Sequence, residues 1–255
     1  MRKDYQAYLI DLDGTMYSGA EKIKEAAPFI ESLREHNKRF LFLTNNSTAT
    51  PQKVVDKLWS ISGVRAYEHE IYTSAEATVQ FIQSRQGQKV YAIGEGGLET
   101  ALKDANFEFD NHSPDYVVVG LDRRVTYEEL KIASLAIRDG AQLIATNPDS
   151  NLPTEEGMIP GNGALIAFLE TATQKEAIVV GKPGKIMMEG ALHKLGMRKD
   201  QVIMIGDNYT TDIIAGIQNG IDTLLVLTGF TQKEDLPNLP IAPTYTVNHL
   251  GEWSI

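Results

Sequence analysis

Short apolar runs alternate with amphipathic segments along most of this chain, and this order most constrains its fold. Residues 7–10 and 39–44 are apolar runs typical of buried strands, and the segment 23–37 between them carries apolar residues at helical spacing. A second helical segment, 51–60, follows. Because a helix between two strands usually joins a parallel pair, the order predicts an α/β fold with a parallel sheet.

The alternating pattern occurs in two blocks, which predicts two lobes. Strands and helices alternate again between residues 89 and 146, and the first block resumes at the strand 178–180. The segment 147–163 is rich in proline and glycine, and we expect a loop that leads back to the first lobe. The predicted domains are a core of residues 1–78 and 174–255 and an inserted lobe of residues 79–173.

Composition excludes several classes of protein. The chain has 255 residues, enough for a domain with an insert, and no cysteine, which excludes disulfides and thiolate ligands and fits a reducing compartment. A formal net charge of −10 argues against a nucleic-acid partner, since phosphate backbones require clustered Lys and Arg. No apolar run approaches the roughly 20 residues that span a bilayer, and no leader-like segment precedes the first strand. We expect a cytoplasmic protein with no membrane partner.

Two carboxylates stand where the first strand ends, in the sequence Leu-Ile-Asp-Leu-Asp-Gly-Thr of residues 9–15. Alternate side chains of an extended segment share a face, so Asp11 and Asp13 are expected to point toward one site. Their charges repel unless a cation lies between them, and Mg²⁺ is the usual ion at carboxylate sites that handle phosphate. Taken alone, the stretch is equally consistent with a polar turn.

Three further polar turns follow apolar strands: Thr44–Asn46, the turn at Lys182, and Asp207–Asp212. Ligands bind at the carboxyl ends of the strands in an open parallel sheet, so the four turns should converge. Taken alone, Thr44 would be a helix N-cap and Lys182 an exposed turn residue. Asp207 and Asp212, each taken alone, would be caps of the helix that follows them. The four turns together favour a functional site.

The four motifs are DxDGT, Thr-Asn-Asn after the second strand, Gly-Lys-Pro, and Gly-Asp-Asn-x-x-Thr-Asp. In this order they resemble the motifs of the haloacid dehalogenase superfamily and, within it, of the NagD-like phosphatases. They span residues 11–212, with an insert of cap size between the second and the third. The resemblance implies a Rossmann-like parallel core, an inserted α/β cap that selects the substrate, and phosphomonoesterase activity.

The resemblance also implies roles for the acidic residues. Asp11 is the expected nucleophile, which forms an aspartyl-phosphate, and Asp13 is the expected general acid and base. Mg²⁺ is expected on the Asp11 carboxylate, the Asp13 backbone carbonyl and Asp207. Asp212 is expected to orient Lys182 or a metal-bound water rather than to bind the ion itself.

Phosphate and the rest of the substrate are expected to contact other motif residues. The Thr44 hydroxyl would bind phosphoryl oxygens, and the Lys182 ammonium would oppose the negative charge that develops on them. The predicted substrate-binding residues of the four motifs are Asp13, Thr44, Asn45, Asn46, Lys182 and Asn208. Those of the cap are Asn147, Asp149, Asn151 and Leu152.

Several functions are consistent with these motifs. A halide leaves without a proton, so an acid at Asp13 favours phosphomonoester hydrolysis over dehalogenation. The resemblance favours small sugar phosphates or acid-sugar phosphates as substrates, with nucleoside monophosphates next. An imidazole would be expected near Leu152 in relatives specialised for pyridoxal phosphate, and its absence disfavours that substrate. A non-catalytic protein that binds a phosphorylated metabolite is the alternative from another class, and a homo-oligomer is left open.

Overall fold

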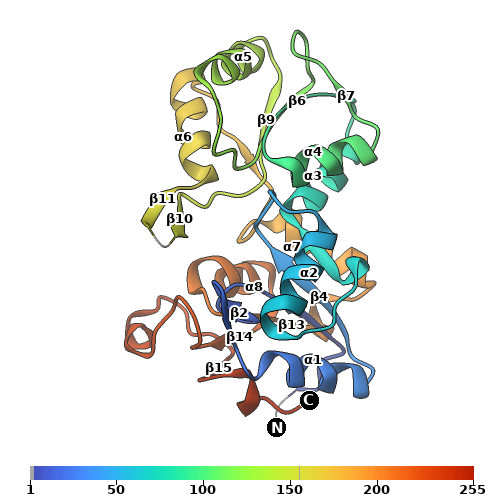
Figure 1. Cartoon of the computed structure of the whole chain (residues 1–255), viewed down its shortest axis with the longest axis vertical. Coiled ribbons are helices and arrows are strands. Elements are labelled where there is room, and N and C mark those ends of the chain that lie inside the picture. Colours follow the sequence, from blue (N-terminus) through green and yellow to red (C-terminus); the bar gives the residue numbers. More distant parts are fainter. Residues whose placement is uncertain (1–2, 155) are drawn as a thin grey trace. The chain divides into compact units, whose positions relative to one another are not determined.

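The computed structural model describes residues 3–154 and 156–255, and the chain divides into two compact units, each with its own sheet (Figure 1). Unit 1 takes in the residues up to Thr44, Pro51–Tyr72 and Met188–Ile255, and unit 2 takes in Asn45–Thr50 and Thr73–Met187. Unit 2 therefore contains the whole predicted insert, 79–173, together with residues on both sides of it. The predicted class, a parallel α/β core with an inserted α/β domain, is confirmed.

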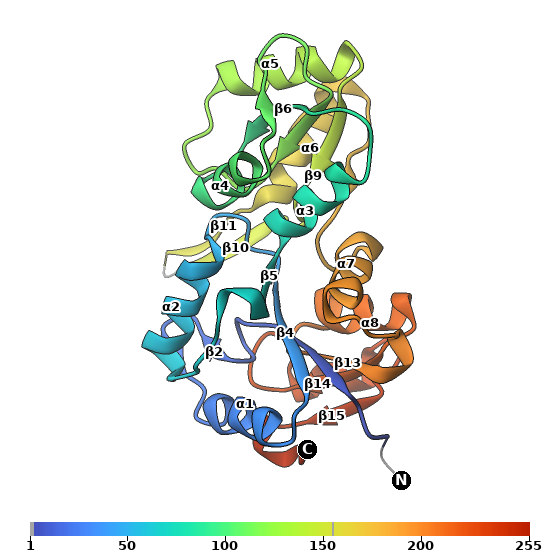
Figure 2. The ribbon, with the colours of Figure 1, turned by 90° about the vertical axis from the view of Figure 1, so that its right-hand side faces the viewer.

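Unit 1 is built on a six-stranded sheet in the order β15, β14, β13, β1, β4, β5 (Figure 2). The pairs from β15 to β4 are all parallel. The strands are β1 (Ala7–Ile10), β4 (Arg39–Thr44), β5 (Ile71–Thr73), β13 (Val202–Gly206), β14 (Asp222–Val226) and β15 (Tyr245–Val247). Every residue of β1 and β13 is buried, which explains their unbroken apolar sequence, since central parallel strands are covered on both faces.

Helices and a hairpin complete unit 1. The helices are α1 (Ala26–Glu35), α2 (Pro51–Ser62), α7 (Lys185–Leu195), whose first three residues belong to unit 2, α8 (Ile214–Asn219) and the 3-10 turns η1 (Glu68–Glu70), η2 (Lys199–Gln201), η4 (Lys233–Asn238) and η5 (Leu250–Glu252). The hairpin pairs β2 (Tyr17–Ser18) with β3 (Glu21–Lys22). The helix α1 begins three residues later than the predicted segment 23–37 and ends two residues earlier, where Asn37 takes a left-handed φ of 54° just beyond the helix.

The turn after β13 differs from the predicted helix 212–219. Tyr209–Ile213 form a π turn (η3), and α8 starts only at Ile214. Asn208 supports this turn twice, because its Oδ1 accepts a hydrogen bond from the Thr210 N–H at 3.0 Å and its carbonyl accepts one from the Asp212 N–H at 2.9 Å. Such widened turns are common at functional sites.

Unit 2 is built on a five-stranded parallel sheet in the order β12, β9, β8, β6, β7. The strands are β6 (Lys89–Ile93), β7 (Glu108–Phe109), β8 (Tyr116–Val119), β9 (Gln142–Ala145) and β12 (Ile178–Val179), and the helices are α3 (Ser74–Gln83), α4 (Gly96–Asp104), α5 (Tyr127–Arg138) and α6 (Asn162–Thr173). A core that includes Ile93, Val117 and Leu169 joins the sheet to α5 and α6.

The prediction of a loop over residues 147–163 was wrong in part. Within it β10 (Asn151–Thr154) pairs antiparallel with β11 (Gly157–Pro160), and α6 begins at Asn162. The glycines that suggested irregular chain serve the hairpin and the helix instead. Gly157 takes a φ of 119°, a conformation that side-chain-bearing residues avoid, and this lets β11 start.

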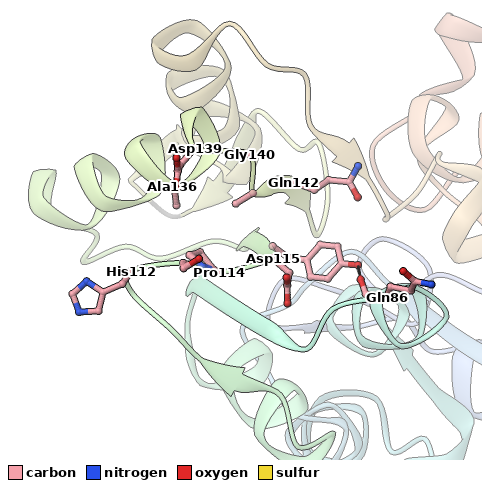
Figure 3. A pocket seen from close by; sticks show the side chains of 11 residues that line it. Gln86, His112, Pro114, Asp115, Ala136, Asp139, Gly140 and Gln142 are labelled. Atoms are coloured by element: carbon pink, nitrogen blue, oxygen red, sulfur yellow. Dashed lines mark hydrogen bonds between the residues drawn. The ribbon is translucent and has the colours of Figure 1, made fainter.

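A cavity of about 360 Å³ lies in unit 2 at the amino ends of β8 and β9 (Figure 3). Its lining includes Gln86, His112 and Asp139, and Gln142, the first residue of β9. Asp115, which also lines it, accepts hydrogen bonds from the Gln88 and Lys89 N–H groups at 2.9 Å. None of its described lining residues is a predicted site residue. Asp11 and Asp207, by contrast, directly follow the carboxyl ends of β1 and β13.

Candidate active site

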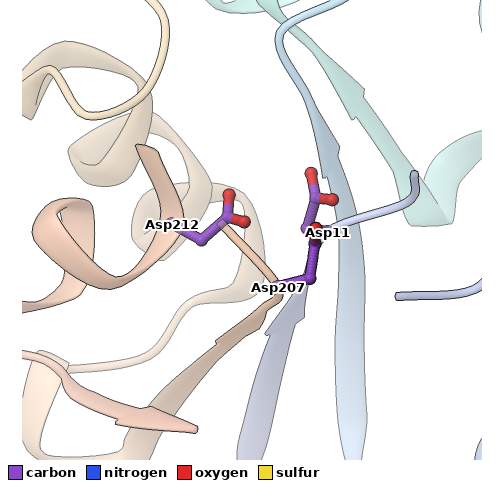
Figure 4. A group of neighbouring side chains, drawn as sticks. All are labelled: Asp11, Asp207 and Asp212. Atoms are coloured by element: carbon purple, nitrogen blue, oxygen red, sulfur yellow. The ribbon is translucent and has the colours of Figure 1, made fainter. Parts of the chain in front are cut away.

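Three carboxylates gather in unit 1 at the carboxyl ends of β1 and β13: those of Asp11, Asp207 and Asp212 (Figure 4). Each offers an oxygen, and these three oxygens lie within 4.8 Å of one another. Asp11 directly follows β1 and Asp207 directly follows β13, and these strands are parallel neighbours. Asp207 and Asp212 are 4% and 1% exposed. The sheet therefore brings together residues about two hundred positions apart.

The donor set of this cluster fits a divalent metal ion. Three carboxylates this close, two of them buried, repel one another unless a cation neutralises them. All the donors are oxygen, which hard divalent cations prefer. An oxygen of Asp212 lies within 4.8 Å of an oxygen of each of the other two, so Asp212 belongs to the same possible donor set as Asp11 and Asp207.

Glycines make room for the cluster. A Cβ on Gly14 or on Gly229 would overlap the Asp207 carboxylate, and a Cβ on Gly206 would overlap the carboxylate of Asp212. Real Cβ atoms essentially never approach other atoms this closely, so a larger residue at these positions would displace a carboxylate. Close packing of the backbone is therefore part of the site.

Backbone donors fix the orientation of two of the carboxylates. The Phe230 N–H donates to Asp207 Oδ2 at 2.6 Å, and the Thr15 hydroxyl approaches the other oxygen of Asp207 at 3.5 Å. The Asn208 N–H donates to Asp212 Oδ2 at 3.1 Å. Each of these bonds holds one oxygen in place. Charge-assisted bonds of this kind are stronger than bonds between neutral groups.

Sequence reasoning missed the turn after β14, which carries Gly229 and Phe230. Thr228, in the same turn, donates its hydroxyl hydrogen to the carbonyl of Gly14 at 2.6 Å. This turn, Thr-Gly-Phe-Thr, directly follows an apolar strand, as the four predicted turns do. The rule that identified those turns would therefore have identified this one as well.

Asp13 lies outside the carboxylate cluster, although its spacing predicted that it would point to the same site as Asp11. That prediction assumed an extended segment, but β1 ends at Ile10 and the chain turns through Gly14 with a φ of 84°. Among the described residues the carboxylate cluster includes Asp11 and not Asp13. The Asp13 side chain is exposed, and its Oδ1 accepts a hydrogen bond from the Gly19 N–H at 3.0 Å. Its role in acid and base catalysis stays a prediction.

A neutral phenol lies beside these charges. Burial raises the pKa of Tyr17, and the negative charges of Asp13 and Asp11 raise it further. The Lys57 ammonium lies 4.2 Å from the centre of the Tyr17 ring, a cation–π contact. Because the raised pKa keeps the phenol protonated, Tyr17 adds no charge next to the cluster.

A second group of predicted residues meets in unit 2. Asn45 Nδ2 donates to both carboxylate oxygens of Asp149, at 3.1 and 3.2 Å, and to the Lys182 carbonyl at 3.0 Å. Asn147 Nδ2 donates to the Asn45 carbonyl at 2.8 Å. Lys182 is 2% exposed, so it is not the exposed turn lysine that its sequence context alone would suggest.

The remaining predicted residues lie in turns and in the hairpin. Thr44 is buried as the last residue of β4. Asn46 is exposed, and its Oδ1 accepts a hydrogen bond from the Thr48 N–H at 2.7 Å. Leu152 is half-buried in β10, opposite Ile159. The structure thus places predicted residues in both units, and the roles assigned to them stay predictions.

No helix in the described part of the chain combines the length and the apolar character that a membrane span requires.

Comparison with known proteins gives consistent matches along the whole chain. Two family profiles match: haloacid dehalogenase-like hydrolase over residues 8–108 and HAD-hydrolase-like over residues 179–253. The 5'-nucleotidase YutF of Bacillus subtilis is 46% identical over 252 residues, which make up 98% of each chain. An acid sugar phosphatase of Staphylococcus epidermidis is 48% identical over 251 residues, 98% of this chain and 96% of the other.

Solved structures agree with these relatives. A mutant of the thermostable p-nitrophenylphosphatase of Bacillus stearothermophilus is 50% identical, matches with a TM-score of 0.89 and covers 99% of both chains. These likenesses confirm both the NagD-like phosphatase resemblance and the predicted enzyme class, a phosphatase. Since the two profiles cover more than half of the residues and the relatives match nearly end to end, the chain belongs to the haloacid dehalogenase-like hydrolase family.

Proposed function

We propose that this phosphatase hydrolyses the phosphomonoesters of small metabolites with Mg²⁺, through an aspartyl-phosphate formed on Asp11. The observation that carries the proposal is the cluster of Asp11, Asp207 and Asp212, because three converging carboxylates suit a hard divalent cation and one of them follows β1 in the DxDGT motif. Asp11 is also the least buried of the three, as a nucleophile that must reach a substrate should be.

In this reaction an Asp11 oxygen attacks phosphorus in line with the ester oxygen. The P–O bond to the leaving group breaks, and Asp13 gives its proton to the departing alkoxide. Asp13 then takes a proton from a water molecule that attacks the aspartyl-phosphate, which releases inorganic phosphate and regenerates both carboxyl groups. The exposure of Asp13 supports this role, since its proton must reach substrate and water in turn.

Mg²⁺ bound by Asp11, Asp207 and the Asp13 carbonyl would neutralise negative charge on the phosphoryl oxygens. Asp212 would bind the ion as well or orient groups beside it. The Thr44 hydroxyl would bind a phosphoryl oxygen, and Lys182 would place its positive charge against the negative charge that grows in the transition state. Burial of Lys182 supports this assignment, because electrostatic stabilisation is stronger where water is excluded.

Sugar phosphates and acid-sugar phosphates are the substrates we favour, and nucleoside monophosphates are the second candidate. The acid sugar phosphatase name of one relative supports the first class, and the 5'-nucleotidase name of YutF supports the second. The hairpin β10–β11 of unit 2 carries Asn151 and Leu152, two of the residues predicted to select the substrate. We assign this choice to unit 2, acting as a cap.

The test is release of phosphate from p-nitrophenyl phosphate with and without Mg²⁺. The wild-type chain should turn over only with the ion, and D11N should lose at least about 1,000-fold in kcat because the amide that replaces the carboxylate is a poor nucleophile. A matched control is D104N, which changes an exposed aspartate at the end of α4 and should keep wild-type turnover. Full turnover of D11N would contradict the mechanism, and binding of phosphate esters without turnover by the wild type would support the non-catalytic alternative.

A further inference from the structure

The side chain of Asn45 is fully engaged within unit 2. Its Oδ1 accepts a hydrogen bond from the Lys182 N–H at 2.8 Å, and its Nδ2 donates to the Lys182 carbonyl at 3.0 Å. One amide thus pairs with both backbone groups of a single residue, as a neighbouring strand would. The second Nδ2 hydrogen points to the Asp149 carboxylate, at 3.1 and 3.2 Å. An amide has two donor hydrogens, and both are used.

The backbone of Asn45 is held as firmly as its side chain. Its carbonyl accepts hydrogen bonds from the Ser74 hydroxyl at 2.6 Å and from Asn147 Nδ2 at 2.8 Å. Asn147 Oδ1 in turn accepts one from the Asp149 N–H at 3.1 Å. These bonds close a ring that runs through Asn45, Asn147 and Asp149. Because both its side chain and its backbone are held by hydrogen bonds, Asn45 can fix the positions of Lys182 and Asp149.

Two further features of unit 2 accommodate the contact between Asn45 and Lys182. A Cβ on Gly181 would lie 2.7 Å from Asn45 Oδ1 and 2.6 Å from the Thr146 carbonyl, so the glycine before Lys182 is what admits the amide. The buried Asn162 side chain donates to the Asn147 carbonyl at 2.8 Å, which anchors the same loop from α6. Segments far apart in sequence are therefore tied together here by side-chain amides.

We propose that Asn45 is a positioning residue. Its amide fixes the backbone of Lys182 and the carboxylate of Asp149 relative to each other and so holds the lysine in the orientation that catalysis requires. The proposal rests on the proposed function, in which Lys182 stabilises the transition state, and it replaces the predicted substrate contact of Asn45 by an indirect role. Asn45 also directly follows Thr44, so one short segment supplies a phosphate ligand and the clamp on the lysine.

A positioning role and a substrate contact predict different kinetics. Loss of a direct contact to bound substrate raises KM, whereas misplacement of a group that acts in the transition state lowers kcat. A shift of about 1 Å in a catalytic group can cost about 100-fold in rate. N45A should therefore lower kcat by about 100-fold on p-nitrophenyl phosphate and leave KM within about threefold of the wild type.

N45D gives a sharper test through pH. The new carboxylate could still accept a hydrogen bond from the Lys182 N–H. It could no longer donate one to the Lys182 carbonyl or to Asp149. It would also place a second negative charge about 3.1 Å from the Asp149 carboxylate. Asp149 and Lys182 are the charged groups among its described contacts, and the other contacts are Ser74 and Asn147. Two carboxyls this close share a proton as pH falls, which restores a donor.

The kcat of N45D relative to wild type should therefore rise as pH falls from 7 to 5. The double variant N45D/D149N places an amide opposite the new carboxylate, so its kcat at pH 7 should be at least about tenfold higher than that of N45D. The matched control is N111D, an exposed asparagine in the same unit, which should show neither effect. Circular dichroism melting of each variant separates misfolding from misplacement, because misfolding predicts no rescue by D149N.

D11N is measured beside these variants so that the two proposals can be separated. Full turnover of D11N would overturn the proposed function. An inactive D11N together with wild-type kcat for N45A and N45D would overturn the positioning role alone. A raised KM with unchanged kcat for N45A would also overturn it, because that result would show that the amide contacts bound substrate. A pH profile of N45D parallel to the wild type, without rescue by D149N, would equally count against it.

Discussion

Gly14 lies so close to Asp207 that a Cβ on the glycine would overlap the carboxylate of the aspartate. The two residues are 193 positions apart, and they meet because β1 and β13 are paired in parallel. The glycine of the DxDGT motif therefore does more than allow a turn. It leaves the space that the Asp207 carboxylate fills.

G14A should displace Asp207 and lower both Mg²⁺ affinity and kcat by about 10- to 100-fold. Gly14 also has a φ of 84°, so alanine there adds backbone strain of about 1–2 kcal/mol. The control is G63A, since Gly63 has a φ of 69° but no atom nearer than 3.8 Å to its Cβ position. Isothermal titration with Mg²⁺ and steady-state kinetics measure the difference. Equal losses in both variants would show that strain, and not displacement of the carboxylate, is responsible.

The effect of D212N on the melting temperature should depend on whether a divalent metal ion is present. In the absence of divalent ions D212N should raise the melting temperature, because it relieves repulsion among three clustered charges. Saturating Mg²⁺ should raise the melting temperature of D212N by less than it raises that of the wild type, because an amide oxygen is a weaker ligand than a carboxylate oxygen. Thermal melts in EDTA and in Mg²⁺ give both values, with D104N as the unaffected control. If the ion stabilised wild type and D212N equally, Asp212 would have no part in holding it.

Exchange of the hairpin 151–160 for that of a relative with another substrate should change the substrate ranking. The β10 and β11 strands are mostly exposed in unit 2, so their replacement should leave the fold intact. Asn147 and Asp149 stay in place in this design, which preserves their bonds to Asn45. Ratios of kcat/KM for sugar phosphates and nucleoside monophosphates measure the change. Mg²⁺ dependence should stay as in the wild type, and an equal loss on every substrate would contradict a selective role for the hairpin.

Acid should weaken unit 2 partly through Asp110. The Lys89 ammonium, 2.9 Å from its carboxylate, and the N–H groups of His112 and Ser113 hold the pKa of Asp110 well below its usual range. The folded state therefore favours the charged form, and the stabilisation is present above the unfolded pKa of about 4 and lost as pH falls below it.

D110N should accordingly lower the urea midpoint at pH 7, and its deficit against wild type should shrink below about pH 4. Circular dichroism during urea titration from pH 7 to pH 3.5 measures both values. D104N, whose exposed side chain lies in the same unit, is the control and should show no such trend. A deficit that stayed constant with pH would mean that the Asp110 charge is not involved.

The parallel core and the convergence of Asp11 with Asp207 could be predicted because both depend on local pattern. Apolar runs mark central strands, and in parallel sheets the residues that follow them share an edge. That the carboxylate cluster includes Asp11 and not Asp13 could not be predicted, because it depends on where β1 stops and on the turn through Gly14.

The partners of Asn45 were equally beyond prediction. Thr-Asn-Asn marks a polar turn, but which groups an amide binds depends on residues 104 and 137 positions away that packing alone brings near. The hairpin β10–β11 escaped notice for a different reason, since its glycine was interpreted as a break in structure when it begins a strand.

The packing of Gly14, Gly206 and Gly229 against Asp207 and Asp212 has a consequence for how this enzyme tolerates change. Part of the geometry of the proposed site is therefore set by residues that have no side chain. A saturation library scored for growth or colour should find these three sites as intolerant as the acids they surround, even toward alanine. During evolution, these three glycines should therefore accept substitutions as rarely as Asp207 and Asp212 do.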